Sequence, residues 1–211
     1  MKIAISRVHF PVTTLGPGRR LGIWVQGCSI RCPGCISSDT WAQTTPDLEV
    51  DEFMYQIEPL LQECDGITIS GGEPFEQPQA LAELLHAIRR LSKVSILVYS
   101  GLPLEELESS DVVKQELIDC LISDPFEVLK VQTKYLRGSD NQRMTCLTTL
   151  GHKVFGSLDR QAMDDDRRLD VMFDADGVVW LAGIPRVGDV TRLQLMLKNQ
   201  GTKMVTTEAR S

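Results

Sequence analysis

Short apolar segments alternate with helical patterns of apolar residues along most of this 211-residue sequence. The apolar segments are rich in valine, isoleucine and leucine and are followed by turn residues, which is typical of buried strands. The segments between them place apolar residues three or four positions apart, as an amphipathic helix does. Strands are expected at residues 3–10, 21–25, 66–70, 94–99 and 117–122, and helices at 50–64, 78–91 and 104–116. This alternation predicts βαβ units, a parallel sheet and the α/β fold class.

The last third of the chain has a different pattern. Two apolar segments at 169–173 and 178–181 flank an Asp-Gly turn within residues 174–177, which predicts a β-hairpin. Asp189 can cap a final helix that ends near Gly201. The sequence therefore predicts a hairpin and a helix after the α/β part.

The composition excludes several classes of protein. The chain has 22 basic and 29 acidic residues and a formal net charge of −7, which argues against a broad nucleic-acid-binding face. No apolar segment approaches the roughly 18 residues that a membrane-spanning helix needs. Arg7 and His9 interrupt the segment where a secretory signal would continue its apolar core. We therefore expect a cytoplasmic protein that binds neither membranes nor nucleic acid directly.

Three of the six cysteines, Cys28, Cys32 and Cys35, form a C-x3-C-x2-C array. In an intracellular chain such clustering favours metal binding over a disulfide framework. Thiolates are soft ligands that suit zinc or an iron–sulfur cluster. A structural zinc site takes four ligands, and no fourth cysteine or histidine stands at a suitable short spacing. The spacing favours a 4Fe-4S cluster, in which three cysteines leave one iron open, and zinc remains the alternative.

The other cysteines and several arginines carry weaker signals. Cys64, Cys120 and Cys146 share no ligand spacing and are interpreted as free thiols. Arg19, Arg20 and Arg137 are interpreted as ordinary surface residues, with attraction of an acidic partner or of a ligand carboxylate as the alternative.

A glycine-rich motif, Ser70-Gly71-Gly72-Glu73-Pro74, directly follows a predicted strand. Paired glycines let the backbone approach a ligand closely and offer bare C=O and N–H groups. Alone the motif is weak evidence, because Gly-Gly-Glu also forms plain turns. Its place one βα unit after a three-cysteine loop makes it strong evidence for a ligand-binding turn.

Several further motifs follow in a fixed order. They are Gly16-Pro17-Gly18-Arg19, Gln26-Gly27-Cys28 through Cys35, Thr40-Trp41, Ser70 through Pro74, Tyr99-Ser100-Gly101 with Leu104-Glu105-Glu106-Leu107, Ser123-Asp124-Pro125-Phe126 and Arg137 through Gln142. With these motifs the chain resembles the radical S-adenosylmethionine (SAM) superfamily over residues 11–145. Within it, the chain is most similar to the anaerobic ribonucleotide reductase activating proteins, a branch that activates glycyl-radical enzymes.

The resemblance implies a fold and a division of the chain. The expected fold is a partial, laterally open (β/α)6-type barrel, with a hairpin and helix added at its C-terminus. Residues 1–145 would form the radical SAM core, with the cluster loop at 28–35. Residues 146–211 would form an extension that packs on the barrel or beside it.

The resemblance also implies which residues bind cofactors. Cys28, Cys32 and Cys35 would hold three irons of the cluster, and the amino and carboxylate groups of SAM would chelate the fourth. The SAM contacts would be Ser70, Gly71, Gly72, Glu73, Tyr99, Ser100, Gly101 and Asp124, which follow predicted strands. The carboxyl ends of parallel strands are where α/β barrels assemble their sites. No catalytic residue is expected beyond the cluster and SAM.

The implied activity is reductive cleavage of SAM to a 5′-deoxyadenosyl radical, which would remove a hydrogen from a glycine of a partner enzyme such as anaerobic ribonucleotide reductase. A flavodoxin or ferredoxin would supply the electron. One alternative keeps this chemistry and changes the substrate to a peptide or a small molecule, with the extension around Gly183-Ile184-Pro185 closing the open side of the barrel. Another is a non-catalytic iron–sulfur or zinc-binding module.

Overall fold

The structure is a computed structural model, and it describes residues 1–173, 178–186 and 188–201. Within these residues the strands are β1 (Lys2–Ile3), β2 (Ile5–Val12), β3 (Arg20–Val25), β4 (Leu48–Glu49), β5 (Gly66–Gly71), β6 (Ser95–Tyr99), β7 (Cys120–Ser123), β8 (Arg143–Cys146), β9 (Leu169–Phe173) and β10 (Val179–Gly183). The α-helices are α1 (Val50–Leu61), α2 (Pro78–Leu91), α3 (Leu104–Leu107), α4 (Asp111–Lys114), α5 (Thr149–Phe155) and α6 (Asp189–Asn199). No helix in this described part combines the length and the apolar character needed to cross a membrane.

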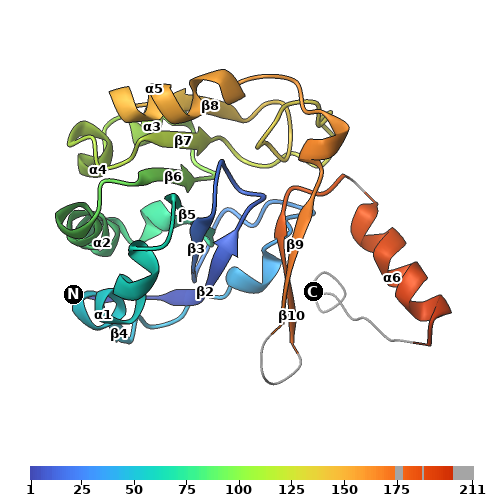
Figure 1. Ribbon diagram of the computed structural model, residues 1–211, viewed down its shortest axis with the longest axis horizontal. Coiled ribbons are helices and arrows are strands. Elements are labelled where there is room, and N and C mark those ends of the chain that lie inside the picture. The colour runs from blue at the N-terminus through green and yellow to red at the C-terminus, as the bar shows by residue number, and fades with distance from the viewer. Residues whose placement is uncertain (174–177, 187, 202–211) are drawn as a thin grey trace.

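The central sheet has six strands in the order β2-β3-β5-β6-β7-β8 (Figure 1). β3, β5, β6 and β7 run parallel, which confirms the predicted α/β class. β2 pairs antiparallel with β3, and β8 pairs antiparallel with β7. The sheet thus has six strands, but its two edge strands are reversed, so the parallel β/α arrangement that the resemblance implies is limited to the four central strands.

Residues along each central strand alternate between the two faces of the sheet, as the pleat of a strand requires. In β3, Leu21 and Ile23 pack in one core cluster with α1 and α2, whereas Trp24 belongs to a cluster on the opposite face. In β6, Ile96 lies in the first cluster and Leu97 in another on the opposite face. Both faces are thus covered, which explains the nearly continuous apolar sequence of these strands.

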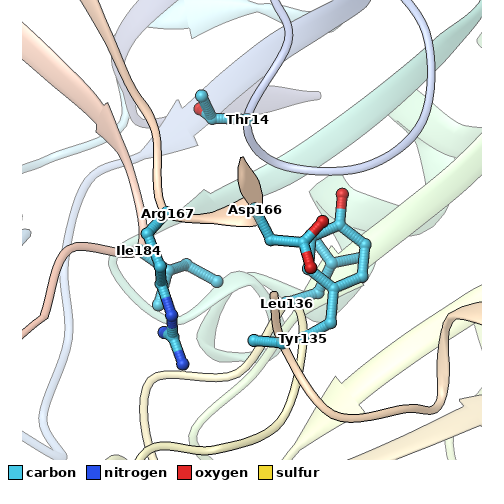
Figure 2. Close-up of a pocket in the computed structure, with 7 residues that line it drawn as sticks. Thr14, Tyr135, Leu136, Asp166, Arg167 and Ile184 are labelled. Atoms are coloured by element: carbon cyan, nitrogen blue, oxygen red, sulfur yellow. The ribbon is translucent and has the colours of Figure 1, made fainter. Parts of the chain in front are cut away.

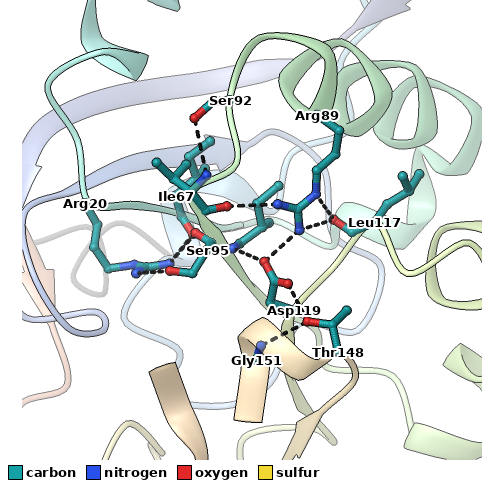
Figure 3. A network of polar contacts seen from close by, with 11 residues as sticks. Arg20, Ile67, Arg89, Ser92, Ser95, Leu117, Asp119, Thr148 and Gly151 are labelled. Carbon is teal, nitrogen blue, oxygen red and sulfur yellow. Dashed lines mark hydrogen bonds and ion pairs between the residues drawn. The ribbon is translucent and has the colours of Figure 1, made fainter. Parts of the chain in front are cut away.

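Arg20 is fully buried against the sheet, so its interpretation as a surface residue is wrong. Its guanidinium donates hydrogen bonds to Thr68 Oγ1 (2.6 Å), the Ile67 carbonyl (2.5 Å) and Ser95 Oγ (3.1 Å). Figure 3 shows Arg20 beside Ile67 and Ser95. Burial lowers the pKa of Arg20 to about 10, which still leaves it charged at neutral pH. Arg137 is also buried, and it pairs with Asp159. The burial of these two arginines could not be predicted from sequence spacing, because their partners lie far away in the sequence.

A second buried polar network, around the Asp119 carboxylate, joins four elements on the side of the sheet where β7 begins. Asp119, which is 2% exposed, accepts hydrogen bonds from Arg89 Nη2 (2.7 Å), the Ile96 N–H (2.8 Å) and Thr148 Oγ1 (2.5 Å) (Figure 3). Thr148 also caps α5 by accepting from the Gly151 N–H. Charge-assisted bonds of this kind fix α2, β6, β7 and α5 relative to one another.

The C-terminal extension packs on the face of the sheet opposite to α1 and α2. Phe155 of α5 is fully buried in a cluster with Leu97 and Ile122. Ala182 of the hairpin β9–β10 is buried with Val12 of β2. The predicted hairpin strands are present at this place, while the predicted Asp-Gly turn at 174–177 lies outside the described residues.

Polar contacts also hold the extension to the core. The Asp170 carboxylate of β9 accepts hydrogen bonds from the backbone N–H and the hydroxyl of both Thr13 and Thr14. The Arg7 guanidinium lies 4.4 Å from the centroid of a Trp180 ring. Figure 2 shows the seam near Thr14, where core and extension residues enclose a cavity of about 10 Å³. This volume is at the lower limit for one water molecule, so the two parts fit closely.

Replacing Asp170 by alanine is expected to loosen the hairpin without unfolding the core. The change removes four hydrogen bonds to a carboxylate. Because the site is partly exposed, we expect a loss of about 2 kcal/mol. Limited proteolysis and amide hydrogen exchange should show faster cleavage and exchange in β9 and β10 only. Asp165→Ala, at an exposed position in the same extension, is the control and should change neither.

Candidate cofactor-binding site

The cysteine loop begins where β3 ends. The N–H of Gly27 donates to the Thr40 carbonyl (2.8 Å) and that of Cys28 to the Trp41 carbonyl (3.3 Å), which closes the base of the loop. Its tip turns through Gly34, whose φ of +76° glycine adopts without strain.

The Glu76 carboxylate fixes the residue after the first cysteine. It accepts hydrogen bonds from the Ser29 N–H (2.8 Å) and the Ser29 hydroxyl (2.5 Å). A third hydrogen bond to this carboxylate comes from Gln43 Nε2 (3.0 Å). Neither glutamate nor glutamine was singled out by the sequence, because their positions relative to the loop depend on how β3 and β5 pair.

Each of the three cysteine thiols receives an N–H hydrogen bond. The backbone N–H groups of Arg31 and Ile30 point to the Cys28 sulfur, and that of Phe126 to the Cys32 sulfur. Burial raises the pKa of both thiols, and these hydrogen bonds lower it in part. Such donors favour the thiolate, the form that ligates metal, over the thiol.

Cys35 has the same surroundings. Burial raises the pKa of its thiol, and hydrogen bonds from the Ser37 backbone and the Trp41 side chain lower it. N–H groups directed at ligand sulfurs are one of the features that set the potential of iron–sulfur clusters.

The glycine-rich motif packs directly against the base of the cysteine loop. The Gly72 N–H donates to the Val25 carbonyl and the Glu73 N–H to the Gly27 carbonyl, both at 2.8 Å. A Cβ atom on Gly72 would lie 2.1 Å from the Gly27 carbonyl oxygen, so only glycine fits. The N–H groups of this turn are therefore used within the protein, which distinguishes it from a phosphate-binding loop.

The Glu73 carboxyl group connects the ends of β5 and β6. Glu73 is 1% exposed and accepts hydrogen bonds from the Phe75 N–H (3.0 Å), the Ser100 hydroxyl (2.9 Å) and the Gly101 N–H (2.8 Å). Burial raises the pKa of Glu73 to about 7, against the lowering effect of these three donors. The side chains of Glu73 and Ser100 thus hold two turns together.

Tyr99 and Gly101 occupy the end of β6. The Tyr99 hydroxyl donates to the Leu136 carbonyl (3.1 Å), and burial raises the pKa of this phenol. A Cβ atom on Gly101 would lie 2.8 Å from Ile30 Cδ1, so the β6 turn touches the cysteine loop.

One cavity of about 590 Å³ brings these motifs together. Of the predicted site residues, Cys28, Cys32, Cys35, Ser70, Gly71, Gly72, Glu73, Tyr99, Ser100 and Gly101 line it. Its volume is in the range of cofactor sites in proteins. The ends of β3, β5 and β6 therefore form a single site, as the rule for parallel strands predicts.

Asp124 is the predicted site residue that the structure does not bring into the cavity lining. Its carboxylate accepts hydrogen bonds from Arg143 Nε (2.6 Å) and Nη2 (2.7 Å), and Arg143 also pairs with Glu105. The guanidinium of Arg143 lowers the pKa of Asp124. Asp124 follows a strand as predicted, but the antiparallel strand β8 places Arg143 beside it and directs the carboxylate to that residue.

Sequence reasoning missed several residues of the cavity wall. Phe126 and Val128 line it from the loop after β7, next to Gly34. Gln142 lines the cavity too. Its side chain holds the loop after β7 in place, because it donates to the Asp124 carbonyl (3.1 Å) and accepts from the Gly138 N–H (2.8 Å). The sequence offered one signal for Gln142, the motif at 137–142.

The extension supplies another part of the wall. Residues 181–186, together with Gly188, Val190 and Thr191, line the cavity. The inner end of the hairpin and the start of α6 therefore face the cysteine loop. Gly183, Ile184 and Pro185, which the alternative hypothesis placed over the open side of the barrel, are among these lining residues.

The residues present fit a 4Fe-4S cluster with a small cosubstrate. Three thiols from one loop face a cavity much larger than a single ion needs, and each accepts N–H hydrogen bonds. The neighbouring turn lacks side chains at Gly71 and Gly72, so a ligand can reach its backbone. Among the described residues, no set of three or more His, Cys, Asp or Glu side chains is arranged to hold one metal ion.

Residues 14–145 match the family described as a 4Fe-4S single cluster domain. The chain belongs to this family. It is a radical SAM protein, which confirms the resemblance found in the sequence. The match ends at residue 145, one residue before β8 ends, so residues 146–211 lie outside it.

Named relatives refine this assignment. The chain is 31% identical over 144 residues to the anaerobic ribonucleoside-triphosphate reductase-activating protein of Escherichia coli K12, covering 64% of this chain and 93% of the relative. It is 34% identical over 139 residues to the protein of that name from Pasteurella multocida, covering 60% and 87%. It is 39% identical over 83 residues to the pyruvate formate-lyase-activating enzyme of Staphylococcus aureus, covering 36% and 33%. The chain is thus a radical SAM enzyme related to glycyl-radical activating enzymes.

The raised pKa of Glu73 predicts a pH-dependent contribution to stability. Since this pKa is about 7 in the folded protein and 4.5 for an ordinary glutamate, the folded state binds more protons between these values. The contribution of Glu73 to the free energy of unfolding should therefore fall by about 3 kcal/mol as the pH rises from 4.5 to 7. Glu73→Gln cannot titrate and should lack this change.

Urea unfolding of both cluster-free proteins at pH 5, 6, 7 and 8 measures the difference directly. The wild type should lose stability relative to Glu73→Gln as the pH rises and then level off. A constant difference over this range would show that the carboxyl group is ionised throughout. Glu63→Gln, at an exposed position, controls for the loss of one negative charge.

Proposed function

We propose that this chain cleaves SAM reductively at a 4Fe-4S cluster and uses the resulting radical to install a glycyl radical on a partner enzyme. The observation that carries the proposal is the single cavity at the ends of β3, β5 and β6, which joins the three cysteines to the turns at Gly71–Glu73 and Tyr99–Gly101. The relatives are activating proteins of anaerobic ribonucleotide reductase and of pyruvate formate-lyase, which supports the proposal.

The cysteine loop holds the cluster in this proposal. The thiolates of Cys28, Cys32 and Cys35 would ligate three irons, and the N–H groups around them stabilise the negative charge on sulfur. When bound and reduced, the cluster supplies the electron that splits SAM into methionine and a 5′-deoxyadenosyl radical. The protein contributes binding and orientation, as it does with cofactors generally.

The Gly71-Gly72-Glu73 turn would receive the amino group of SAM. Its N–H groups at Gly72 and Glu73 are directed to the β3 side, so its carbonyl oxygens are the groups it offers to a ligand. Carbonyl oxygens accept hydrogen bonds from an ammonium group. Glu73 acts by position, because its carboxyl group holds this turn to Ser100 and Gly101.

Apolar side chains would protect the radical from stray donors. Trp24, Ile30, Phe126 and Leu181 line the cavity from four different segments. Excluding water in this way prevents side reactions of a reactive intermediate.

Exposed apolar residues beside the cavity support a protein as the substrate. Ile36 and Val128 line the cavity and are 41% and 39% exposed, and Leu129 and Val131 on the same loop are 96% and 67% exposed. Large exposed apolar side chains that gather beside a site are typical of protein interaction surfaces. The proposed partner is a glycyl-radical enzyme such as anaerobic ribonucleotide reductase, with flavodoxin or ferredoxin as electron donor.

A second candidate function is favoured by the wall that the extension adds. Leu181 to Arg186 and the start of α6 line the cavity, and these residues lie beyond the part that matches the family. A narrower site would suit radical modification of a peptide or a small molecule. This candidate keeps the cleavage of SAM and differs in the hydrogen donor.

Anaerobic reconstitution with iron and sulfide, followed by SAM and dithionite, tests the chemistry. Formation of 5′-deoxyadenosine supports both radical candidates, whereas an intact cluster without cleavage would indicate a non-catalytic module. Adding the anaerobic ribonucleotide reductase of the same organism should then produce a glycyl radical signal in electron paramagnetic resonance. A reductase with its radical glycine replaced by alanine is the control. Deoxyadenosine formation without that radical would favour the second candidate.

A further inference from the structure

Two cysteines outside the cofactor cavity lie opposite each other on neighbouring strands. Cys120 begins β7 and Cys146 ends β8, and the antiparallel register pairs them directly. The Leu147 N–H donates to the Asp119 carbonyl (2.8 Å), which places the two cysteines between ladder hydrogen bonds as a non-hydrogen-bonded pair. In such a pair the Cα atoms are about 4.5 Å apart and the side chains are closest.

The two thiols interact with each other. Both side chains belong to the cluster around Leu97 and Ile122, and a hydrogen bond links their sulfurs. Cys120 is fully buried, whereas Cys146 is partly exposed on an edge strand. Burial raises the pKa of both thiols, and the bond from Cys120 partly lowers the pKa of Cys146. Cys146 is therefore the thiol that a reagent in solvent reaches and the easier one to ionise.

We propose that Cys120 and Cys146 form a redox-sensitive dithiol that closes to a disulfide when a low-molecular-weight disulfide is present. A disulfide needs Cα atoms about 4.4–6.8 Å apart, which directly opposed residues of a non-hydrogen-bonded pair satisfy. Cys64 has no such arrangement. It lies in the core cluster on the other face of the sheet, and its thiol donates to the Leu61 carbonyl.

The reaction is two thiol–disulfide exchanges. The Cys146 thiolate attacks one sulfur of the small disulfide, whose S–S bond breaks, and one small thiol leaves. Cys120 then gives up its proton and attacks the Cys146 sulfur, the mixed disulfide breaks, and the second small thiol leaves with that proton. Two protein thiols are oxidised and one small disulfide is reduced to two thiols.

The disulfide would restrain the wall of the cofactor cavity. The bond would enclose residues 121–145, and Phe126, Val128 and Gln142 of this segment line the cavity. Tyr99, which also lines it, packs in the cluster that holds the cysteine pair. Closing a loop of this length constrains the unfolded chain and stabilises the folded one.

Oxidised glutathione added to the anaerobic, cluster-loaded protein tests the proposal. Alkylation, digestion without reduction and mass spectrometry should then show the peptide of Cys120 linked to that of Cys146, with Cys64 alkylated and the iron content unchanged. The melting temperature should rise by roughly 5–10 °C and return after reduction.

Single substitutions identify the order of the steps. Cys146→Ser should show neither the link nor the rise in melting temperature, and Cys120→Ser should stop at one glutathione bound to Cys146. Cys64→Ser is the matched control and should behave as the wild type. Alkylation of both Cys120 and Cys146 at saturating oxidant, or a persistent glutathione adduct on Cys146 of the wild type, would overturn the proposal. Mapping of the linked peptides in the wild type, together with the result for Cys146→Ser, tests the proposal even if Cys120→Ser, at a buried position, fails to fold.

Discussion

Cys32→Ala is expected to lose the cluster and the cleavage of SAM while keeping its fold. The Cys32 side chain is partly exposed in the loop after β3 and belongs to none of the buried core clusters. Alanine therefore leaves no cavity, and the melting temperature of the cluster-free protein should shift by no more than about 2 °C. Two cysteines cannot hold a cluster that needs three, so 5′-deoxyadenosine should fall below detection after anaerobic reconstitution.

Cys64→Ala is the matched control for this experiment. Cys64 is buried in the core beside α1 and does not line the cofactor cavity. Its loss should lower the free energy of unfolding by about 1 kcal/mol and leave iron content and SAM cleavage intact. A Cys32→Ala protein that unfolds, or that still binds the full amount of iron and cleaves SAM, would contradict the proposed role of the loop.

Much of the fold and of the candidate site could be predicted from local sequence patterns. The strands at 21–25, 66–70 and 94–99 are buried on both faces, which explains their apolar sequences, and the last two are followed by glycine or serine. Cys28 to Cys35 and Ser70 to Glu73 were recognisable because their chemistry depends on residue types at short spacing. The parallel arrangement of the strands then brings the turns that follow them to one edge of the sheet.

Contacts between distant segments could not be predicted in the same way. Arg20 is buried because acceptors on β5 and β6 surround it, and Asp124 is turned away from the cavity by Arg143 on the antiparallel strand β8. The pairing of Cys120 with Cys146 depends on the register of β7 and β8. Glu73 lines the cavity as a predicted site residue, but its hydrogen bonds to Ser100 and Gly101, which link two turns, depend on how β5 and β6 pair.

The largest effect on the proposed activity without loss of a metal ligand is expected for Gly72→Ala. The new Cβ atom would lie 2.1 Å from the oxygen and 2.8 Å from the carbon of the Gly27 carbonyl. Both atoms are backbone, so the turn must move away from the cysteine loop and break the bond from the Glu73 N–H to Gly27. A displacement of about 1 Å at a reacting centre costs roughly 100-fold in rate, and we expect a loss of that size in 5′-deoxyadenosine formation.

Gly156→Ala separates this effect from the general cost of replacing a glycine. Gly156 has a helical φ of −58°, and a Cβ atom there would meet nothing within 4 Å. The control should be neutral or more stable by up to about 1 kcal/mol and should keep its activity. Gly72→Ala should retain its iron, because the three thiols are unchanged, and lose SAM cleavage. Equal activity in the two variants would show that the turn does not position SAM, whereas loss of iron with activity would place the damage in the cysteine loop.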